Sequence, residues 1–502
     1  MSYLGIDIGT TGCKAVAFDE HGRQLASAYR EYLVLSPGEG WAELDSSQVC
    51  DSCLAVMSEA ARACGSDPVR ALGVSSQGEA FTPVGSGGEY LASAMVSSDS
   101  RAAGIATQWS ESFGPEELYR ITGHTAHPMF TLFKLIWLRE NRPDVWKSAV
   151  AFHCFEDLLH RRLGVEPAMS WPLAGRTMLF DVREHRWDPG ILAAARISPR
   201  LLPRTLASGE VVGEIPAATA RALGLAEGAI VVAGGHDQPC GALGAGVIEP
   251  GTAVYATGTV ECITPAFSTA VMGAELFAGN LCTYDYTIRG MYTTVAFSLT
   301  GGNLLKWFRD QIGHPELWRS EGSDAYGTLI DSMPDEPTGL ISLPYFTPSG
   351  TPHFDVSTPG AVVGLRLTTT RVEILRALLE GVAFEMRVNL AILADSGIPV
   401  NELIAVGGGA RSLKWLQLKA DVLGKPIKRA AVTEAGCLGA AMLARAAHTG
   451  EDVRDLAKKW VRVTDEVRPR PAAADFYDRR FPAYLRLYPA IKAYMEDLSG
   501  QA

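Results

Sequence analysis

Two short segments of this 502-residue chain share one design, a strand, a turn of glycine and threonine, and a second strand. The first is GIDIGTTGCK at residues 5–14, and the second, about 250 residues later, is TAVYATGTVECI at residues 252–263. Each segment opens one half of the chain, which predicts a duplicated domain whose two turns face each other across a cleft. The alternative is coincidence in a chain with 51 glycines. A chain of this length exceeds the size at which one hydrophobic core keeps growing, so two domains are expected in either case.

The first turn is suited to holding oxygen atoms. Gly9 and Gly12 permit positive φ and let a ligand approach bare backbone, while Thr10 and Thr11 supply hydroxyl groups beside free N–H groups. The spacing fits neither a dinucleotide fingerprint nor a P-loop, because no GxGxxG leads into a helix and Lys14 is followed by alanine. From these residues alone, an ordinary tight hairpin remains the alternative.

The composition excludes several classes of protein. With 45 basic against 56 acidic residues the net charge is −11, which argues against a general nucleic-acid or membrane-surface binder. No apolar run approaches the roughly 20 residues of a membrane helix, and the first strand begins too early for a signal peptide. Nine cysteines at irregular spacings indicate reduced thiols, so we expect a cytoplasmic protein. Cys50 and Cys53 form a CxxC pair inside a helical pattern, with no second pair or histidine cluster that would favour a metal site.

The pattern of apolar residues predicts an α/β protein with mixed sheets flanked by helices. Strands are expected at residues 4–8, 15–18, 24–33, 69–75 and 228–235, and helices at residues 47–64, 131–142, 154–163 and 413–423. A further glycine site, GGGA at residues 407–410, follows a strand and precedes a helix. Exposed N–H groups and the helix dipole favour the ribose or phosphates of a nucleotide there, whereas a plain turn would need only one glycine.

Taken in order, the two hairpins, GGHDQPCGALG at residues 234–244 and the triple-glycine turn resemble the FGGY carbohydrate kinases. FTLFKLIWL at residues 130–138 and GLRLTTTRVEILRALLEG at residues 364–381 are similar to the two signatures of that family. The likeness runs from residue 4 to about residue 445. It implies two ribonuclease H-like domains of the sugar kinase, heat-shock protein and actin superfamily on either side of a cleft. Residues 1–246 would bind the sugar and supply the catalytic base, and residues 247–502 would bind ATP.

The resemblance also assigns roles on the ATP side of the cleft, where it implies ATP and Mg²⁺. Asp7 would face the magnesium ion through water, because Mg²⁺ dehydrates reluctantly. The residues that would line the phosphates and the nucleoside are Gly9, Thr10, Thr11 and Lys14 on the first turn, Thr257, Gly258 and Thr259 on the second, and Gly302, Asn303, Gly408, Gly409 and Ala410 around the nucleoside.

Asp237 is the predicted catalytic base. Phosphoryl transfer to an alcohol needs a group that takes the hydroxyl proton. Asp237 follows an apolar strand and two glycines, so its carboxylate would emerge at the end of the strand beside open backbone, and the resemblance places the catalytic aspartate of the family at this position. From the residues alone, a helix N-cap is the alternative. His236 is expected to pack or to form hydrogen bonds, without a catalytic role.

The positions that match the sugar-binding residues of the family are Gln77, Gly78, Glu79, Asp99, Arg101, Asp237 and Gln238. Glu79 and Gln238 supply the acceptors and donors that a polyhydroxylated molecule needs, although Glu79 taken alone also suits a solvated turn. Xylulose kinases usually carry Met-His at positions 78–79 and Trp-Asn at 97–98, where this chain has Gly-Glu and Ser-Ser. Glycerol kinases carry Arg-Glu at the first of these places, and residues 127–134 are somewhat closer to fuculose kinases.

We therefore expect an ATP-dependent kinase that transfers the γ-phosphate of MgATP to a hydroxyl group of a ketose, xylulose-like or fuculose-like, or of a related polyol. Two alternatives remain open. One is a kinase of a non-sugar acceptor such as a signalling dihydroxyketone, and the other is an ATP-hydrolysing regulatory switch of the same superfamily. A switch needs no polyol pocket in its first domain, whereas a kinase does. Family members are often dimers, so a homodimer is a further possibility.

Overall fold

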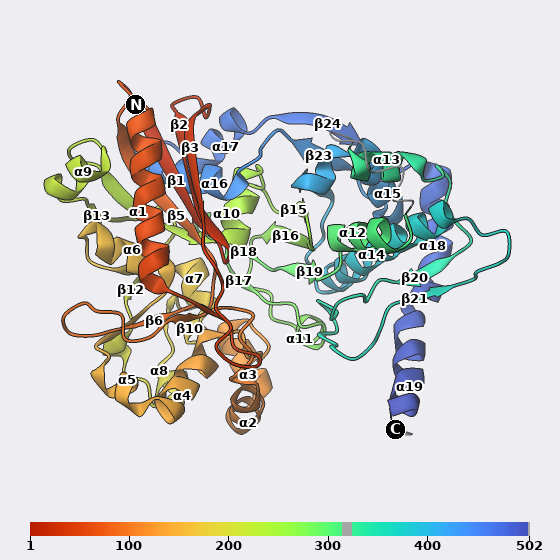
Figure 1. Ribbon diagram of the computed structural model, residues 1–502, viewed down its shortest axis with the longest axis horizontal. Coiled ribbons are helices and arrows are strands. Elements are labelled where there is room, and N and C mark those ends of the chain that lie inside the picture. The colour runs from red at the N-terminus through yellow and green to blue at the C-terminus, as the bar shows by residue number, and fades with distance from the viewer. Residues whose placement is uncertain (314–323, 500–502) are drawn as a thin grey trace.

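The computed structural model describes residues 1–313 and 324–499, and two mixed sheets lie side by side in it, one in each half of the chain (Figure 1). The N-terminal sheet has the strand order β13-β14-β5-β1-β2-β3. Its strands are β1 (Ser2–Ile8), β2 (Gly12–Asp19), β3 (Gln24–Glu31), β5 (Val69–Ser76), β13 (Val211–Glu214) and β14 (Ile230–His236). Strand β1 pairs antiparallel with β2 and parallel with β5, and β5 pairs parallel with β14.

The C-terminal sheet repeats this pairing. Its strands are β15 (Thr252–Thr257), β16 (Glu261–Phe267), β17 (Tyr284–Asp285), β18 (Tyr292–Thr293), β19 (Ala296–Ser298), β22 (Glu402–Val406), β23 (Ile427–Ala430) and β24 (Val463–Val467). Strand β15 pairs antiparallel with β16 and parallel with β22, and β22 pairs parallel with β23. The predicted α/β class with mixed sheets is therefore confirmed, and the two similar sequence segments open two sheets of the same topology.

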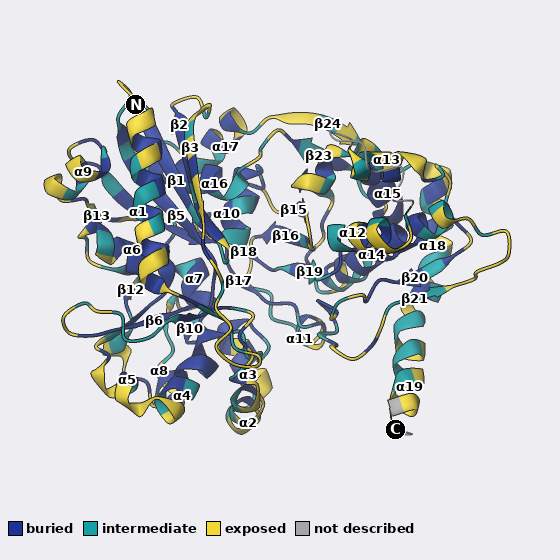
Figure 2. Cartoon of the chain, in the orientation of Figure 1, coloured by how far each residue is buried: buried dark blue, intermediate teal, exposed yellow. Residues whose placement is uncertain are grey.

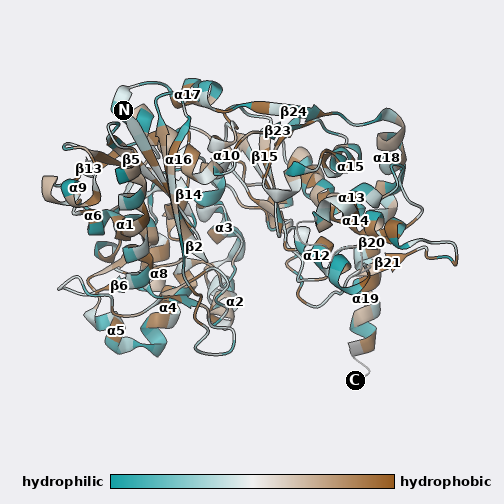
Figure 3. Cartoon of the chain, turned by 45° about the horizontal axis from the view of Figure 1, so that its top comes forward, coloured by the Kyte–Doolittle hydropathy of each residue, from teal (hydrophilic) through white to brown (hydrophobic). Residues whose placement is uncertain are grey.

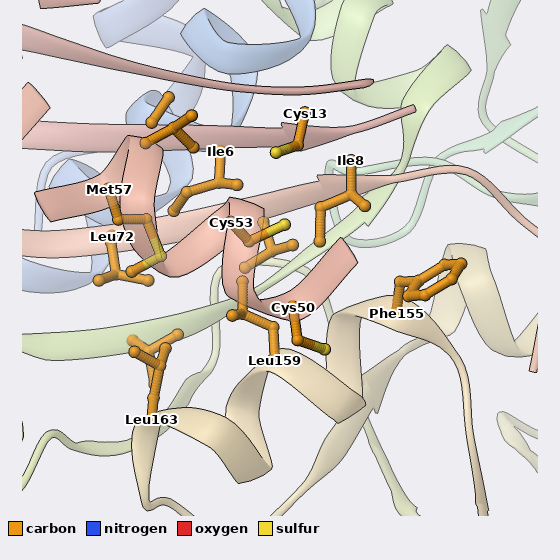
Figure 4. Close-up of a cluster of buried hydrophobic side chains, with 14 of the residues drawn as sticks. Ile6, Ile8, Cys13, Cys50, Cys53, Met57, Leu72, Phe155, Leu159 and Leu163 are labelled. Carbon is orange, nitrogen blue, oxygen red and sulfur yellow. The ribbon is translucent and has the colours of Figure 1, made fainter. Parts of the chain in front are cut away.

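Helices cover both faces of the N-terminal sheet. Helix α1 (Ser46–Ala63) and helix α6 (Phe155–Leu163) pack on one face, where Figure 4 shows their side chains against Ile6 and Leu72 of the strands. Cys50 and Cys53 belong to this apolar cluster, with 1% of each side chain exposed. Because the central strands β1, β2, β5 and β14 are covered on both faces, nearly all of their residues are buried (Figure 2), as is typical of sheets between two helical layers.

Helix α16 (Ala435–Thr449) covers the other face, although it comes from the second half of the sequence. It packs on β1, on β5 and on helix α10 (Asp237–Gly244), and Figure 3 shows hydrophobic residues along this contact. Glycines allow the close approach, since a Cβ on Gly5 would lie 1.7 Å from the carbonyl oxygen of Cys437 and one on Gly73 would lie 2.4 Å from another carbonyl of the helix. The halves of the chain interlock here, and the predicted domain boundary after residue 246 stays a prediction.

The remaining elements surround these sheets. The first half adds α2 (Ala103–Phe113), α3 (Pro115–Thr122), α4 (Thr131–Asn141), α5 (Pro143–Ser148), α7 (Trp171–Gly175), α8 (Pro189–Ala195), α9 (Ala217–Leu223) and the short strands β4 (Glu43–Leu44), β6 (Thr82–Val84), β7 (Ala94–Met95), β8 (Ala151–His153), β9 (Ala168–Ser170), β10 (Phe180–Asp181), β11 (Arg186–Trp187) and β12 (Arg204–Leu206). The second half adds α11 (Ala274–Ala278), α12 (Gly302–Gln311), α13 (Ala325–Ser332), α14 (Arg371–Asp395), α15 (Leu413–Leu423), α17 (Val453–Trp460), α18 (Pro471–Leu485), α19 (Leu487–Ser499), β20 (Ile341–Leu343) and β21 (Ala361–Val363).

The predicted strands correspond to β1, β2, β3, β5 and β14, and the predicted helices to α1, α4, α6 and α15. Helix α15 shows why its ends could be located from the sequence. The hydroxyl of Ser412 caps it by accepting a hydrogen bond from the Trp415 backbone N–H, and Gly424 ends it in the left-handed region. Among the helices that the structure describes, none is both long and apolar enough to span a membrane.

Candidate active site

A cavity of about 220 Å³ is lined by residues from both halves of the chain. Strands β1, β5 and β14 are mutually parallel neighbours, so the segments that follow them meet at one edge of the sheet. The predicted residues that line the cavity are Thr10, Gln77, Gly78, Glu79, Asp237 and Gln238. The second half of the chain contributes Cys262, Asn280, Cys282, Val295, Phe297 and Phe354. One wall is therefore rich in polar groups, and the opposite wall is mainly apolar.

Asp237 opens helix α10 at this cavity. Burial, and after it the negative charges of Asp7 and Glu79, raise the pKa of its carboxyl to about 7. The N-cap position is occupied by His236, without a capping hydrogen bond from its side chain, so Asp237 is not the helix cap. Its Oδ1 is buried and has no hydrogen-bond partner among the described residues. A carboxyl group that titrates near neutral pH on a cavity wall is suited to taking a proton from a bound hydroxyl.

Glu79 is held tightly in the wall of the cavity. Only 2% of it is exposed, so it is not a solvated turn residue, and its φ of 64° lies in the left-handed region. Its Oε1 accepts a hydrogen bond of 2.5 Å from Arg176 Nε, and its Oε2 accepts one of 2.8 Å from the Ser97 hydroxyl. The Arg176 guanidinium lies 5.0 Å from the ring centre of Phe130 and 5.6 Å from that of Tyr284. The ion pair thus presents fixed donors and acceptors beside the cavity.

Asp99 and Arg101 are not among the described residues that line this cavity. Arg101 Nη2 donates hydrogen bonds of 2.7 Å to Asp99 Oδ2 and to Glu43 Oε1, and its guanidinium lies 3.8 Å from the ring centre of Trp41. Asp99 Oδ2 also accepts the backbone N–H of Ala42 at 2.8 Å. These two residues hold the loop that carries Ser97, and their predicted contact with an acceptor stays a prediction.

Hydrogen bonds and an ion pair join the first turn to residues from both halves of the chain. The carbonyl oxygen of Gly9 accepts hydrogen bonds from Gln77 Nε2 at 2.9 Å and from the Tyr32 hydroxyl at 2.6 Å. The Thr10 hydroxyl donates to Gln77 Oε1 at 3.2 Å. Lys14, at the far side of the turn, forms a 2.7 Å ion pair with Glu434. The turn predicted to face phosphates is therefore tied to Gln77 on the cavity wall on one side and to the second half of the chain on the other.

A second cavity, of about 400 Å³, lies where β22 and β23 end. It is lined by Gly408, Ala410 and Glu434 among others. Gly407 has a φ of 92°, and a Cβ on Gly409 would lie 2.6 Å from the hydroxyl of Thr257. Only glycine permits this turn to approach the second hairpin so closely.

The other residues predicted to bind ATP gather at the same place. The backbone N–H of Gly302 donates a 2.8 Å hydrogen bond to the carbonyl oxygen of Gly258, and that of Asn303 donates one of 3.1 Å to Thr259. The beginning of α12 is thus joined to the second hairpin turn, and this turn contacts the triple-glycine segment. The cradle of bare backbone beside an open cavity fits a nucleotide.

Asp7 lies at the end of β1, where its Oδ1 accepts a 2.6 Å hydrogen bond from the Ser75 hydroxyl. Burial is the main cause that raises the pKa of this carboxyl, so a cation beside it would favour the charged form. Within the described residues no group of three or more His, Cys, Asp or Glu side chains is placed to hold a metal ion. A single carboxylate with hydroxyl groups nearby fits Mg²⁺, which keeps several waters and shares phosphate oxygens.

Sequence reasoning missed Arg176, Ser97, His124 and Tyr284. Arg176 lies in the largely apolar run LAGRTMLF, and a charge inside such a run is the one signal that could have indicated a buried, paired group. His124 lines the cavity, with its Nδ1 2.7 Å from the carbonyl oxygen of Thr122. No pattern in the sequence predicts that Tyr284 lies near this cavity.

Comparison with known proteins gives one consistent result. Residues 2–244 match the family model described as FGGY family of carbohydrate kinases, N-terminal domain, and residues 253–448 match the C-terminal domain of the same family. A xylulose kinase from Staphylococcus epidermidis is 26% identical over 99% of this chain and 98% of its own length. A glycerol kinase from Methylibium petroleiphilum is 31% identical over 92% of this chain and 94% of its own. The crystal structure of xylulose kinase from Rhodospirillum rubrum has a TM-score of 0.90 at 27% identity, covering 99% of this chain and all of that one.

Proposed function

The chain belongs to the FGGY family of carbohydrate kinases, and from this premise we propose that it transfers the γ-phosphate of ATP to a hydroxyl group of a ketose or related polyol. The observation that carries the proposal is Asp237, a carboxyl with a pKa of about 7 whose buried Oδ1 has no hydrogen bond among the described residues and which lies on the polar wall of a small cavity. A neutral acceptor is favoured, because the charge of the buried Arg176 is already matched by Glu79.

In the proposed reaction Asp237 takes the proton from the hydroxyl group of the acceptor while the oxygen of that hydroxyl attacks the γ-phosphorus of ATP. Glu79 and Gln238 orient the other hydroxyl groups of the acceptor by hydrogen bonds. The apolar wall from the second half of the chain, which includes Phe297 and Phe354, excludes water from the reacting atoms. Hydrolysis of ATP without an acceptor is suppressed by the same exclusion.

The ATP phosphates are proposed to lie between the two hairpin turns, with the nucleoside toward the triple-glycine segment. Residues 1–246 would then supply the acceptor site and the base, and residues 247–502 the nucleotide site. Asp7 would hold Mg²⁺ through water. When bound, this ion would neutralise negative charge on the phosphate oxygens.

A coupled assay of ADP release tests the proposal. Pentuloses, hexuloses and small polyols are offered one at a time, and at least one of them should raise ADP production well above the rate with ATP alone. Asp237→Asn keeps the size of the side chain but cannot take a proton, so kcat should fall by at least about a hundredfold while the Kd of both substrates changes only a few-fold. A variant that keeps more than about a tenth of the kcat, with chemistry rate-limiting, would remove Asp237 from this role.

A further inference from the structure

His236 stands between the proposed base and a tyrosine from the other half of the chain. Its Nδ1 lies 2.9 Å from the hydroxyl oxygen of Tyr284, and its Nε2 lies 3.2 Å from Oδ1 of Asp237. Tyr284 is fully buried on β17, and 6% of His236 is exposed. We propose that His236, held in one tautomer by Tyr284, positions the carboxylate of Asp237. The inference rests on the proposed role of Asp237 as base.

The electrostatic environment of His236 keeps its imidazole neutral. Burial, followed by the positive charge of Arg176 and the presence of His124, lowers the pKa of His236 well below its ordinary value. Burial also raises the pKa of the Tyr284 hydroxyl strongly, so the tyrosine keeps its proton. A neutral imidazole carries one N–H and one acceptor nitrogen, and which nitrogen holds the proton is set by its neighbours.

The hydrogen bond to Tyr284 decides the tautomer. Among the residues that the structure describes, the Tyr284 hydroxyl has no other hydrogen-bond partner, so donating to Nδ1 is the arrangement that uses its proton. The single N–H of His236 then lies on Nε2 and faces Asp237. With the opposite tautomer the tyrosine proton would lack a partner and Nε2 would carry no proton toward Asp237, so burial disfavours that arrangement.

Asp237 Oδ1 is the group that needs this donor. It is buried, and in the present geometry the 3.2 Å approach of Nε2 is not aligned as a hydrogen bond. Hydrogen bonds in active sites are often long or poorly aligned without substrate and tighten in the reactive complex. A bond from Nε2 to Oδ1 would leave Oδ2 for the acceptor hydroxyl and fix the plane of the carboxylate.

The neighbouring glycine supports this role of the ring. A Cβ on Gly78 would lie 3.1 Å from Cδ2 of His236 and 3.2 Å from Cβ of Arg176, so a larger residue at position 78 would press on the imidazole. The absence of a side chain at position 78, a departure from the related kinases noted above, leaves the space that the ring and Arg176 occupy.

Two amide replacements of His236 distinguish the roles of its two ring nitrogens. The amide nitrogen of His236→Gln reaches the position of Nε2 and can still donate to Asp237, whereas the amide of His236→Asn reaches only the position of Nδ1. We expect His236→Gln to retain kcat within about threefold, and His236→Asn to lower it by about 10- to 100-fold with the KM of each substrate changed only a few-fold, because loss of an orienting partner has effects of this size.

Tyr284→Phe provides an independent arm if the asparagine variant folds poorly. It should lower kcat about fivefold or more in the native background and have no further effect in the His236→Gln background, since an amide has no tautomers. Tyr286→Phe is the matched control, because it removes a buried hydroxyl that donates 2.6 Å to the Val247 carbonyl oxygen, away from the cavity. Its kcat should stay at the native value.

Equal kcat values for the glutamine and asparagine variants, or additive effects of Tyr284→Phe in both backgrounds, would overturn the positioning role. Neither result would contradict the proposal that Asp237 is the base. That assignment is tested separately by Asp237→Asn, and if this variant keeps its activity the proposed base fails and the positioning role fails with it.

Discussion

Replacing Glu79 with alanine should destabilise the protein strongly, because it leaves Arg176 without its carboxylate. The side chains of the pair are 3% and 10% exposed, so little water is available to solvate the orphaned guanidinium. Breaking a buried ion pair by removing one partner typically costs about 3 to 5 kcal/mol. We expect a loss of this size in the free energy of unfolding, well above the loss of under about 1 kcal/mol that is typical of an exposed pair.

Two further variants separate the charge from the backbone. Glu79→Gly also removes the carboxylate but relieves the left-handed backbone at this position, so it should be about 1 kcal/mol more stable than Glu79→Ala. The double variant Glu79→Ala/Arg176→Met removes both charges and should be more stable than Glu79→Ala alone. Guanidinium unfolding followed by circular dichroism gives the free energy of unfolding of each of the three variants, with linear extrapolation applied to the first transition.

The reasoning is refuted if Glu79→Ala lies within about 1 kcal/mol of the native protein, or if the double variant is less stable than the single one. Kinetics under conditions where Glu79→Ala remains folded give a second check. The KM for the acceptor should rise by about 5- to 150-fold, which corresponds to the 1 to 3 kcal/mol of one lost polar partner, while the KM for ATP stays nearly constant. Equal changes in both KM values would point to a folding defect.

Three other outcomes follow from the geometry. Because the pKa of Asp237 is raised to about 7, its basic form accumulates as the pH rises, and kcat should increase between about pH 6 and 8. Asp237→Asn should lose this pH dependence, and a native kcat that falls over the same range would contradict the prediction. Gly409→Ala should raise the KM for ATP by about tenfold or more, because the new Cβ would lie 2.6 Å from the Thr257 hydroxyl, whereas Gly104→Ala, whose Cβ meets nothing within 4 Å, should leave it unchanged. Small-angle scattering should show a more compact particle when an acceptor and a non-hydrolysable nucleotide are both present, and an unchanged radius of gyration would count against closure of the cleft.

The fold was largely predictable because its signals are local. The central strands of the first sheet are runs of buried residues, and helix α15 has a serine cap at its start and a glycine at its end. The repeated hairpin could be read from short segments, and the parallel neighbours of each hairpin strand follow the same order in both sheets. What could not be predicted is that α16 crosses from the second half of the sequence to pack on the first sheet, since only its contact with Gly5 and Gly73 reveals this.

The candidate site was predictable in its segments but not in its pairings. The ends of β1, β5 and β14 carry predicted residues because parallel strands bring their carboxyl ends together. The partner of Glu79 is 97 residues away in sequence, and nothing local in either segment links the two. Asp99 and Arg101 illustrate the opposite case, since these residues are two apart in sequence and pair with each other, and their contact with an acceptor stays a prediction.

The positions of the proposed base and of the proposed nucleotide site depend on two helices that contact each other. Asp237 is the first residue of α10, and α16, which packs on α10, begins directly after Glu434. A Cβ on Gly436, in the first turn of α16, would lie 3.1 Å from Cγ of Asp7, and Glu434 lines the cavity beside the triple-glycine turn. A shift of α16 along α10 would therefore move the proposed base relative to the carboxylate of Asp7. The glycine contacts between α16 and the first sheet resist such a shift, so this packing keeps the two carboxylates at a fixed separation.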